Sequence, residues 1–307
     1  MTRTITPLVP DHTAISAARA RQGQLVKPPG ALGRLEELAI WLAGVSGTER
    51  PPVRPRVVVA AADHGVAAEG VSAYPAEVTQ QMLGTVATGR AAINALAAAV
   101  AAPVVVVDAG VRGAPRIDGV QRLGLAPSAN LSREPALRDH ALHTALGAGR
   151  TAAAAARAQG VNVLVGGELG IGNTTPATAL ACWLTGRPPA ELTGPGTGLD
   201  AAGVARKAAV VESALALHSP AITDPLDALR RLGGGDLAVL AGLALGAAEH
   251  GVGLVCDGVI AAAAIAVAAA HEPGVVPWLL AGHCSAEPAH AALLDHLALA
   301  PVLDLGL

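Results

Sequence analysis

The sequence predicts an α/β fold: a Rossmann-like parallel sheet with flanking helices. Two observations carry this prediction. Four short apolar runs rich in β-branched residues have the composition of strands buried on both faces of a sheet, and alanine-rich helical sequence separates them. The chain has 307 residues, 52% of them hydrophobic, which is enough for one large core. Strands that alternate with helices favour a parallel sheet with crossover connections.

The predicted elements follow one another in a regular order. The four strands are expected at 56–60, 104–107, 161–165 and 252–255, with helical sequence between them, for example at 91–100 and 152–158. The segments before Lys27 and after Trp278 are also helical in composition but fall outside the alternation. We therefore expect a large α/β domain at 27–278 and a small helical domain formed by 1–26 together with 279–307.

Charge and cysteine usage argue against several classes of protein. A formal net charge of −3 without any basic run argues against nucleic acid as a partner. Three widely spaced cysteines (Cys182, Cys256 and Cys284) fit a reducing compartment and predict no disulfide framework. We therefore expect a cytoplasmic protein.

A mean hydropathy of +0.47 raises the question of a membrane segment. The longest uncharged stretches are 91–107, which Asn94 and Pro103 interrupt, and 258–270, which is too short to span a bilayer. The N-terminus lacks the apolar region of a signal peptide. No membrane partner is expected.

The segment 166–176, directly after the third predicted strand, is the most informative loop. In an open parallel sheet, ligands bind beyond the carboxyl ends of the strands. The segment contains four glycines, which let the backbone approach a ligand closely, and Thr174 or Thr175 can cap the helix that begins near Pro176. A helix N-terminus of this kind attracts phosphate. Glu168 lies beside this expected phosphate site, where a carboxylate suits a cationic or protic group of a ligand.

A second glycine-rich segment, 193–200, precedes a helix for which Asp200 is the expected N-cap. Lys207 lies two turns into that helix and is either a charge for a phosphate or a solvated side chain; local sequence leaves both readings open. Neither glycine segment matches a P-loop, and no G-x-G-x-x-G follows the first strand. A dinucleotide-dependent dehydrogenase is therefore disfavoured.

Two histidine-containing segments allow more than one interpretation. Asp63 and His64 follow the first strand, where adjacent side chains point apart, so a hydrogen-bonded loop anchor is favoured over a catalytic dyad. A metal site or a hydrolase triad near the C-terminus is disfavoured, because Pro288 interrupts the helical spacing and a nucleophile elbow is missing. The residues concerned are His283, Cys284, Ser285, Glu287 and His290.

Taken in order, these loops resemble the nicotinate-nucleotide–dimethylbenzimidazole phosphoribosyltransferase family of cobalamin biosynthesis. The matching segments are 27–36, 63–66, 70–75, 167–175, 196–198, 257–258, 283–287 and 301–305. No single segment is decisive, but together they span nearly the whole chain in the order of the family. The resemblance is therefore specific.

The resemblance implies an activity and partners. The family transfers phosphoribose from nicotinate mononucleotide to 5,6-dimethylbenzimidazole, which gives nicotinate and α-ribazole 5′-phosphate for the lower ligand of cobalamin. It implies a homodimer in which each chain has a Rossmann-like domain and a small helical domain made from both chain ends. It implies neither a cofactor nor a metal.

The resemblance also assigns site residues. Glu168 corresponds to the carboxylate near the reacting centre. The phosphate and nucleotide site is expected to comprise Gly170, Gly172, Asn173, Thr174, Lys207, Ser285 and Asp257. The wall of the benzimidazole slot is expected to comprise Ser72, Tyr74, Gln81 and Met82.

One departure concerns the general base. The family pattern continues past the Leu-Asp-Leu run into Arg-Leu-Gly-Glu-Gly, whose Glu is regarded as the base, whereas this sequence finishes at Gly306 and Leu307. Either the polypeptide is truncated or this member has lost the base, and two alternatives to the family activity stay open. One is a homologue that binds the same ligands with impaired or no turnover, and the other is a transferase for a different aromatic acceptor.

Overall fold

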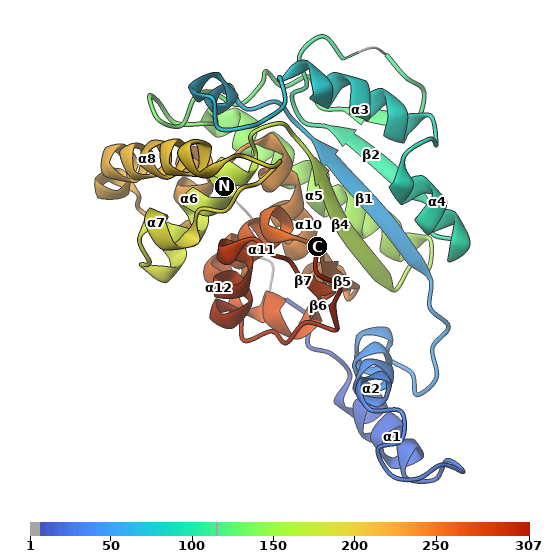
Figure 1. The fold of residues 1–307 in the computed structure, drawn as a ribbon. Helices are drawn as coiled ribbons and strands as arrows, with labels where there is room; N and C mark the ends of the chain where they lie inside the picture. Colours follow the sequence, from blue (N-terminus) through green and yellow to red (C-terminus); the bar gives the residue numbers. More distant parts are fainter. Residues whose placement is uncertain (1–6, 115) are drawn as a thin grey trace.

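A six-stranded sheet, in which every strand is parallel to its neighbours, forms the centre of the molecule (Figure 1). The structure is a computed structural model that describes residues 7–114 and 116–307; residues 1–6 of the expected N-terminal segment lie outside it. The strand order is β3-β2-β1-β4-β5-β6. The strands are β1 (Pro55–Ala61), β2 (Val104–Asp108), β3 (Val120–Arg122), β4 (Val163–Leu169), β5 (Gly253–Cys256) and β6 (Leu279–Ala281).

The predicted fold class and all four predicted strands are confirmed, as β1, β2, β4 and β5. The side chains of β1 explain why its sequence is apolar from Val57 onward. Val57 and Val59 enter a core on one face of the sheet, whereas Val58 and Ala60 enter the larger core on the other face. Because both faces are covered, no position in the middle of this strand favours a polar residue. The edge strands β3 and β6 have only three residues each and were not predicted.

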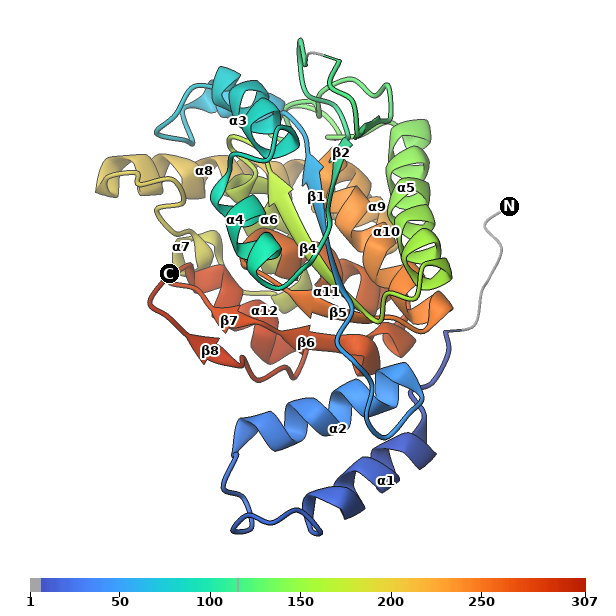
Figure 2. The ribbon, with the colours of Figure 1, turned by 90° about the vertical axis from the view of Figure 1, so that its right-hand side faces the viewer.

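Helices cover the sheet as two layers (Figure 2). Helices α3 (Glu77–Ala87) and α4 (Ala92–Ala99) supply the core on the face of Val57. Helices α5 (Asp139–Ala158), α10 (Gly235–His250) and α11 (Val259–His271) supply the larger core. Between these elements lie α6 (Thr174–Thr185), α7 (Pro189–Leu192), α8 (Ala201–His218), α9 (Pro225–Leu232) and three 3-10 helices, η1 (Gly65–Glu69), η2 (Ser219–Ala221) and η3 (Pro273–Trp278).

The two ends of the chain lie in different surroundings. Helices α1 (His12–Gln22) and α2 (Arg34–Ser46) pack against each other and project from the sheet (Figure 2). The C-terminal segment contains β6, a two-residue pairing of β7 (His283–Cys284) with β8 (Leu303–Asp304), and α12 (Pro288–His296). Helix α12 packs on α6 and α11 of the large core.

This placement differs from the expectation that residues 279–307 join the N-terminal segment in a small helical domain. The reason is the apolar run at the start of the segment, where Leu279 and Ala281 are buried and β6 extends the sheet beside β5. A helix was expected there, but a short apolar run does not distinguish a strand from a helix. One link between the chain ends is a 2.8 Å hydrogen bond from Arg34 Nη2 to the carbonyl oxygen of Ala300. In the part of the chain that the structure describes, no helix is both long and apolar enough to cross a membrane.

Candidate active site

The carboxyl ends of three neighbouring strands bring polar side chains to one edge of the sheet. His64 follows β1, Glu168 lies near the end of β4 in register with Ala60, and Asp257 follows β5 directly. His64 is buried, Glu168 is partly buried and Asp257 is exposed. This is the edge at which open parallel sheets bind their ligands.

Glu168 is held by the loop that follows it. The side-chain amide of Asn173 donates to Glu168 Oε2 and also to Asp236 Oδ2, at 3.1 Å. Burial raises the pKa of Glu168 to about 7, and the negative charges of Asp236 and Asp257 act in the same direction. The hydrogen bond from Asn173 and the charge of His64 partly oppose that rise. Glu168 can therefore gain or lose a proton near neutral pH.

The start of α6 differs in detail from the prediction. Thr174 is the first helical residue, and Asn173 occupies the N-cap position without a side-chain cap bond, because its amide serves the two carboxylates instead. Neither Thr174 nor Thr175 is therefore the cap, whereas Pro176 does lie in the first turn, as expected. The loop requires glycine, because a Cβ at Gly170 would lie 2.6 Å from the carbonyl oxygen of Ala62.

Lys207 reaches the same helix start from α8. Its side chain is fully buried, and its Nζ donates to Thr174 Oγ1 at 2.8 Å and to the carbonyl oxygen of Gly194 at 3.2 Å. Burial lowers the pKa of Lys207 to about 8, although the charge of Glu287 opposes the shift. Of the two interpretations that the sequence left open, the solvated side chain is excluded. Asp200 caps α8 as predicted, because it accepts from the backbone N–H of Gly203 at 2.8 Å.

The segment before α12 contacts the second glycine-rich segment, 193–200. Glu287 Oε1 accepts from the backbone N–H of Gly196 at 2.7 Å, and Ser285 Oγ lies 2.9 Å from Nδ1 of His290. Burial, and to a smaller extent the charge of His283, lowers the pKa of His290 to about 4, so this ring is neutral at pH 7. His283 Nε2 lies 3.4 Å from Asp257 Oδ1, which connects this segment to the end of β5.

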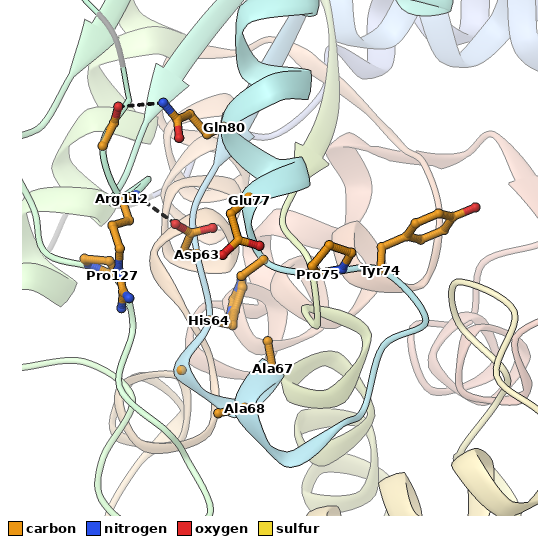
Figure 3. Close-up of a pocket in the computed structure, with 13 residues that line it drawn as sticks. Asp63, His64, Ala67, Ala68, Tyr74, Pro75, Glu77, Gln80, Arg112 and Pro127 are labelled. Carbon is orange, nitrogen blue, oxygen red and sulfur yellow. Dashed lines mark hydrogen bonds between the residues drawn. The ribbon is translucent and has the colours of Figure 1, made fainter.

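A cavity of about 470 Å³ opens beside this edge, between η1, α3 and the loop around Arg112 (Figure 3). His64 and Asp63 lie on its floor, and Tyr74 lines it from the segment before α3. The carboxylate of Asp63 accepts from the backbone N–H of Arg112 at 2.7 Å, which is the loop anchor that the sequence predicted. The other lining residues are Gly65, Ala67, Ala68, Pro75, Ala76, Glu77, Gln80, Gly113 and Pro127.

Comparisons with known proteins identify the family. A family model described as "Phosphoribosyltransferase" matches residues 8–307. The nicotinate-nucleotide–dimethylbenzimidazole phosphoribosyltransferase of Ectopseudomonas mendocina is 50% identical over 300 residues, which are 97% of this chain and 86% of that protein. The protein of the same name from Chloroflexus aggregans is 49% identical over all of this chain and 88% of its own length. The chain belongs to this family.

Solved structures of the family agree with the fold. The crystal structure of CobT from Thermus thermophilus aligns with a TM-score of 0.90 at 45% identity, over 96% of this chain and 89% of that chain. A second crystal structure from the same organism, named in full as the nicotinate-nucleotide–dimethylbenzimidazole phosphoribosyltransferase, aligns with the same TM-score at 44% identity. The resemblance read from the ordered loops is thereby confirmed.

The residues expected in the benzimidazole slot of this phosphoribosyltransferase take three kinds of position. Tyr74 lines the cavity. Ser72 Oγ lies 3.0 Å from Thr197 Oγ1, which ties its loop to the second glycine loop. Gln81 and Met82 are exposed on α3 outside the lining of the cavity. The neighbouring Gln80 does line it, and its Nε2 donates to the carbonyl oxygen of Gly113 at 2.8 Å.

The loop between β4 and α6 and the cavity share a wall. Ala67 lines the cavity, and a Cβ at Gly172 would lie 3.4 Å from the Cβ of Ala67. A Cβ at Gly170 would likewise lie 3.1 Å from Nε2 of His64 on the cavity floor. The glycines therefore let the loop lie directly against the cavity.

Sequence reasoning missed the contact between His64 and Asp236. Nε2 of His64 lies 3.1 Å from Oδ1 of Asp236, and both side chains are buried. The available signal was the run of three glycines before Asp236. A Cβ at Gly234 would lie 2.2 Å from Cε1 of His64, so glycine is required for the ring to fit. A glycine run of this kind indicates a close approach but does not name the side chain that approaches.

Proposed function

We propose that this chain transfers phosphoribose from nicotinate mononucleotide to 5,6-dimethylbenzimidazole, giving nicotinate and α-ribazole 5′-phosphate. The observation that carries the proposal is a buried ammonium and a partly buried carboxylate at the two ends of one glycine-rich loop. Lys207 contacts Thr174 at one end, and Glu168 lies at the other. Membership of the family, at about half identity over nearly the whole chain, supports the choice of substrates.

The loop and Lys207 would bind the phosphate of nicotinate mononucleotide. Gly170, Gly172 and the start of α6 supply close backbone approach and the positive end of a helix dipole. The Lys207 ammonium, buried beside Thr174, adds a formal charge where a low dielectric strengthens its attraction. Ser285 and Asp257 would complete the nucleotide site from the neighbouring segments.

Glu168 would face the ribose. When the C1′–N bond breaks, the bonding electrons leave with the ring nitrogen, the nicotinate ring loses its positive charge, and positive charge develops on the sugar. An ionised carboxylate in a partly buried site stabilises that charge, and such electrostatic terms are typically worth a factor of about 10²–10³ in rate. With its pKa raised to about 7 by burial, Glu168 is also able to accept the proton that the benzimidazole ring releases.

The cavity next to the loop would hold the acceptor. It has an apolar wall in Pro75 and Ala67, which suits a flat ring, and Tyr74 lies at its margin with its ring directed outward (Figure 3). Ser72, Gln81 and Met82 remain candidates for contacts at its entrance, and Gln80 is an additional candidate within it. The shared wall at Gly170 and Gly172 would bring the acceptor nitrogen toward the sugar.

The test is a product assay with nicotinate mononucleotide and 5,6-dimethylbenzimidazole that follows the release of nicotinate, with calorimetry of each ligand alongside. Release should require the benzimidazole, and Glu168→Gln should lower kcat about 10²–10³-fold. Binding without release would support the alternative of a homologue that binds and does not turn over. If the chain neither binds the two ligands nor releases nicotinate, the assignment is refuted. Unchanged turnover in Glu168→Gln would remove the proposed role of this residue.

Assembly and location are part of the same proposal. We expect a homodimer, as the resemblance to the family implies, and sedimentation equilibrium of the purified chain would detect it. We expect the protein in the cytoplasm, because a phosphorylated nucleotide substrate is charged and does not cross a bilayer unaided. Fractionation of cells that produce the chain would locate it.

A further inference from the structure

A chain of four polar side chains runs from the buried end of β1 to Glu168. It consists of His64, Asp236, Asn173 and Glu168, contributed by four different elements. His64 follows β1, Asp236 lies in the first turn of α10, Asn173 precedes α6 and Glu168 lies in β4. His64, Asp236 and Asn173 are each at least 95% buried. Side chains from four elements meet in this way only if the fold brings them together.

The contacts are continuous. His64 Nε2 lies 3.1 Å from Asp236 Oδ1, Asp236 Oδ2 accepts from the Asn173 amide at 3.1 Å, and the same amide nitrogen donates to Glu168 Oε2. Both ring nitrogens of His64 are closed off from solvent and, within the described residues, neither makes a well-directed hydrogen bond. The ring of His64 therefore lies in close contact with the Asp236 carboxylate within a closed site.

Glycines in two loops leave room for the side chains of His64 and Asp236. A Cβ at Gly234 would lie 2.2 Å from Cε1 of His64, and a Cβ at Gly170 would lie 3.2 Å from Oδ2 of Asp236. Two glycines from separate loops thus make room for the same ion pair. An isolated buried ion pair is weak evidence for a stabilising role, because desolvation offsets its attraction. A role in the chemistry of Glu168 is the better account of why the fold accommodates it.

We propose that His64 is a positioning residue of the transferase, which acts through Asp236 and Asn173 to orient the Glu168 carboxylate and keep it ionised. This inference rests on the proposed function of Glu168 and deepens it. In this proposal Glu168 touches the substrate, whereas His64 acts on the reaction only through the side chains that connect it to Glu168.

The charges around Glu168 give the direction of the effect. Asp236 from α10 and Asp257 after β5 both raise the pKa of Glu168, whereas His64 and the amide of Asn173 lower it. Burial alone would lower the pKa of His64, but the charges of Asp236, Asp63 and Glu168 raise it above its usual value. The neighbouring carboxylates thus favour the charged form of His64, and a positive charge there favours the ionised form of Glu168. Removal of this charge should leave Glu168 protonated up to a higher pH.

The first experiment measures pH profiles of kcat for the full chain and for His64→Gln. The substitution should lower kcat at pH 7 on the order of 10-fold to 100-fold, as for the outer residues that orient metal ligands. It should move the acid limb of the profile to higher pH, restore part of the activity at high pH, and leave KM for nicotinate mononucleotide nearly unchanged. An acid limb at the wild-type pH would overturn the proposal.

A double-mutant cycle separates this role from a purely structural one. In a Glu168→Gln background, His64→Gln should change kcat by no more than about twofold, because the group through which it acts is gone. Equal effects in both backgrounds would overturn the proposal. The matched control is His218→Gln, since His218 is also buried and its Nε2 lies 2.9 Å from the carbonyl oxygen of Leu131. This control should lower stability without moving the acid limb.

A measurement that needs no turnover distinguishes failure of this inference from failure of the proposed function. The 13C carboxyl resonance of Glu168, assigned by its absence in Glu168→Gln, should titrate at a higher pH in His64→Gln than in the unaltered chain. If His64→Gln does not fold, His64→Asn takes its place, and the same rise of the Glu168 midpoint is expected because the charge of His64 is removed. An unmoved midpoint would count against the inference alone. Absence of benzimidazole-dependent nicotinate release from the unaltered chain would count against the proposed function alone.

Discussion

At the scale of single residues, Lys207 gives a prediction that depends on its burial. Because burial lowers its pKa to about 8, this side chain loses its charge as the pH rises through that value. The substrate phosphate, with a second pKa near about 6, is already dianionic there. KM for nicotinate mononucleotide should therefore rise between pH 7 and 9, with little change in kcat, and initial-rate kinetics across that range would measure it.

Lys207→Met supplies the comparison. Removing a charge-assisted hydrogen bond to the phosphate, worth about 1.5–3 kcal/mol, should raise KM at pH 7 by about 10-fold to 100-fold. The variant has no ammonium left to titrate, so its KM should be flat between pH 7 and 9. A flat profile in the unaltered chain would contradict the assignment of Lys207 to the phosphate.

Residues were predictable from the sequence to the extent that they lie in the loops at strand ends. Glu168 stood out because a carboxylate within a glycine-rich loop has no simple structural explanation. The contact between His64 and Asp236 could not be predicted, because the two residues lie far apart in the sequence and only the tertiary fold brings them together. That Gln80 lines the cavity was not predicted, because it depends on the rotation of α3 about its axis. Glu77 and Gln80, three residues apart, face the cavity together.

At the scale of elements, helices α5 and α10 approach so closely that their backbones touch. A Cβ at Gly149 would lie 2.1 Å from the carbonyl oxygen of Val239, and a Cβ at Gly242 would lie 2.1 Å from that of Leu146. Gly149→Ala should therefore force the helices apart and destabilise the protein by about 1–3 kcal/mol. Urea unfolding followed by circular dichroism would measure the loss.

Gly147 provides the matched control for this prediction, because it lies on the same helix but faces open space. A Cβ there would meet nothing within 4 Å. Gly147→Ala should stabilise the protein by about 0.5–1 kcal/mol, since alanine loses less backbone entropy in a helix. Equal effects of the two substitutions would show that helix propensity, and not the close contact, governs this region.

Strands with a strong apolar sequence pattern were predictable, whereas a strand that forms only because it pairs with a neighbouring strand was not. Strands β1, β2, β4 and β5 each contain or adjoin a run of β-branched and aliphatic residues, which is visible without a structure. Strand β6 has only three residues, and its Leu-Leu-Ala sequence fits a helix equally well. It becomes a strand because β5 presents an open edge beside it. Sequence patterns report burial, whereas the choice of partner depends on the rest of the fold.

At the scale of the whole molecule, the site places several titratable groups at one edge of a sheet whose interior is apolar. Nothing in such an arrangement favours folding by itself, because each buried charge must give up its hydration. The large core between the sheet and helices α5, α10 and α11 provides the stability that offsets this. Removing the charge of Glu168, whose pKa is raised by burial, should then make the folded protein more stable and less active.

The pH dependence of stability tests whether the charge of Glu168 destabilises the folded protein. Its pKa is about 7 in the folded protein, where burial raises it, against an ordinary value of 4.5. Below pH 4.5 the group is protonated in both states. Above pH 7 it is ionised in both, and the folded state is less stable by an amount on the order of 3 kcal/mol. The contribution of Glu168 to stability is therefore fully present below pH 4.5 and lost as the pH rises through 7.

Glu168→Gln should accordingly unfold at a higher urea concentration than the unaltered chain at pH 8, and the difference should disappear as the pH falls from 7 to 4.5. Glu212→Gln is the control, because Glu212 is exposed on α8 and should change stability by no more than about 0.5 kcal/mol at either pH. A Glu168→Gln variant that is no more stable at pH 8 would mean that the ionised carboxylate is fully compensated in the folded protein. The unfolding midpoints at pH 5 and pH 8 decide between these outcomes without any substrate, so the electrostatic design of the site can be tested separately from its chemistry.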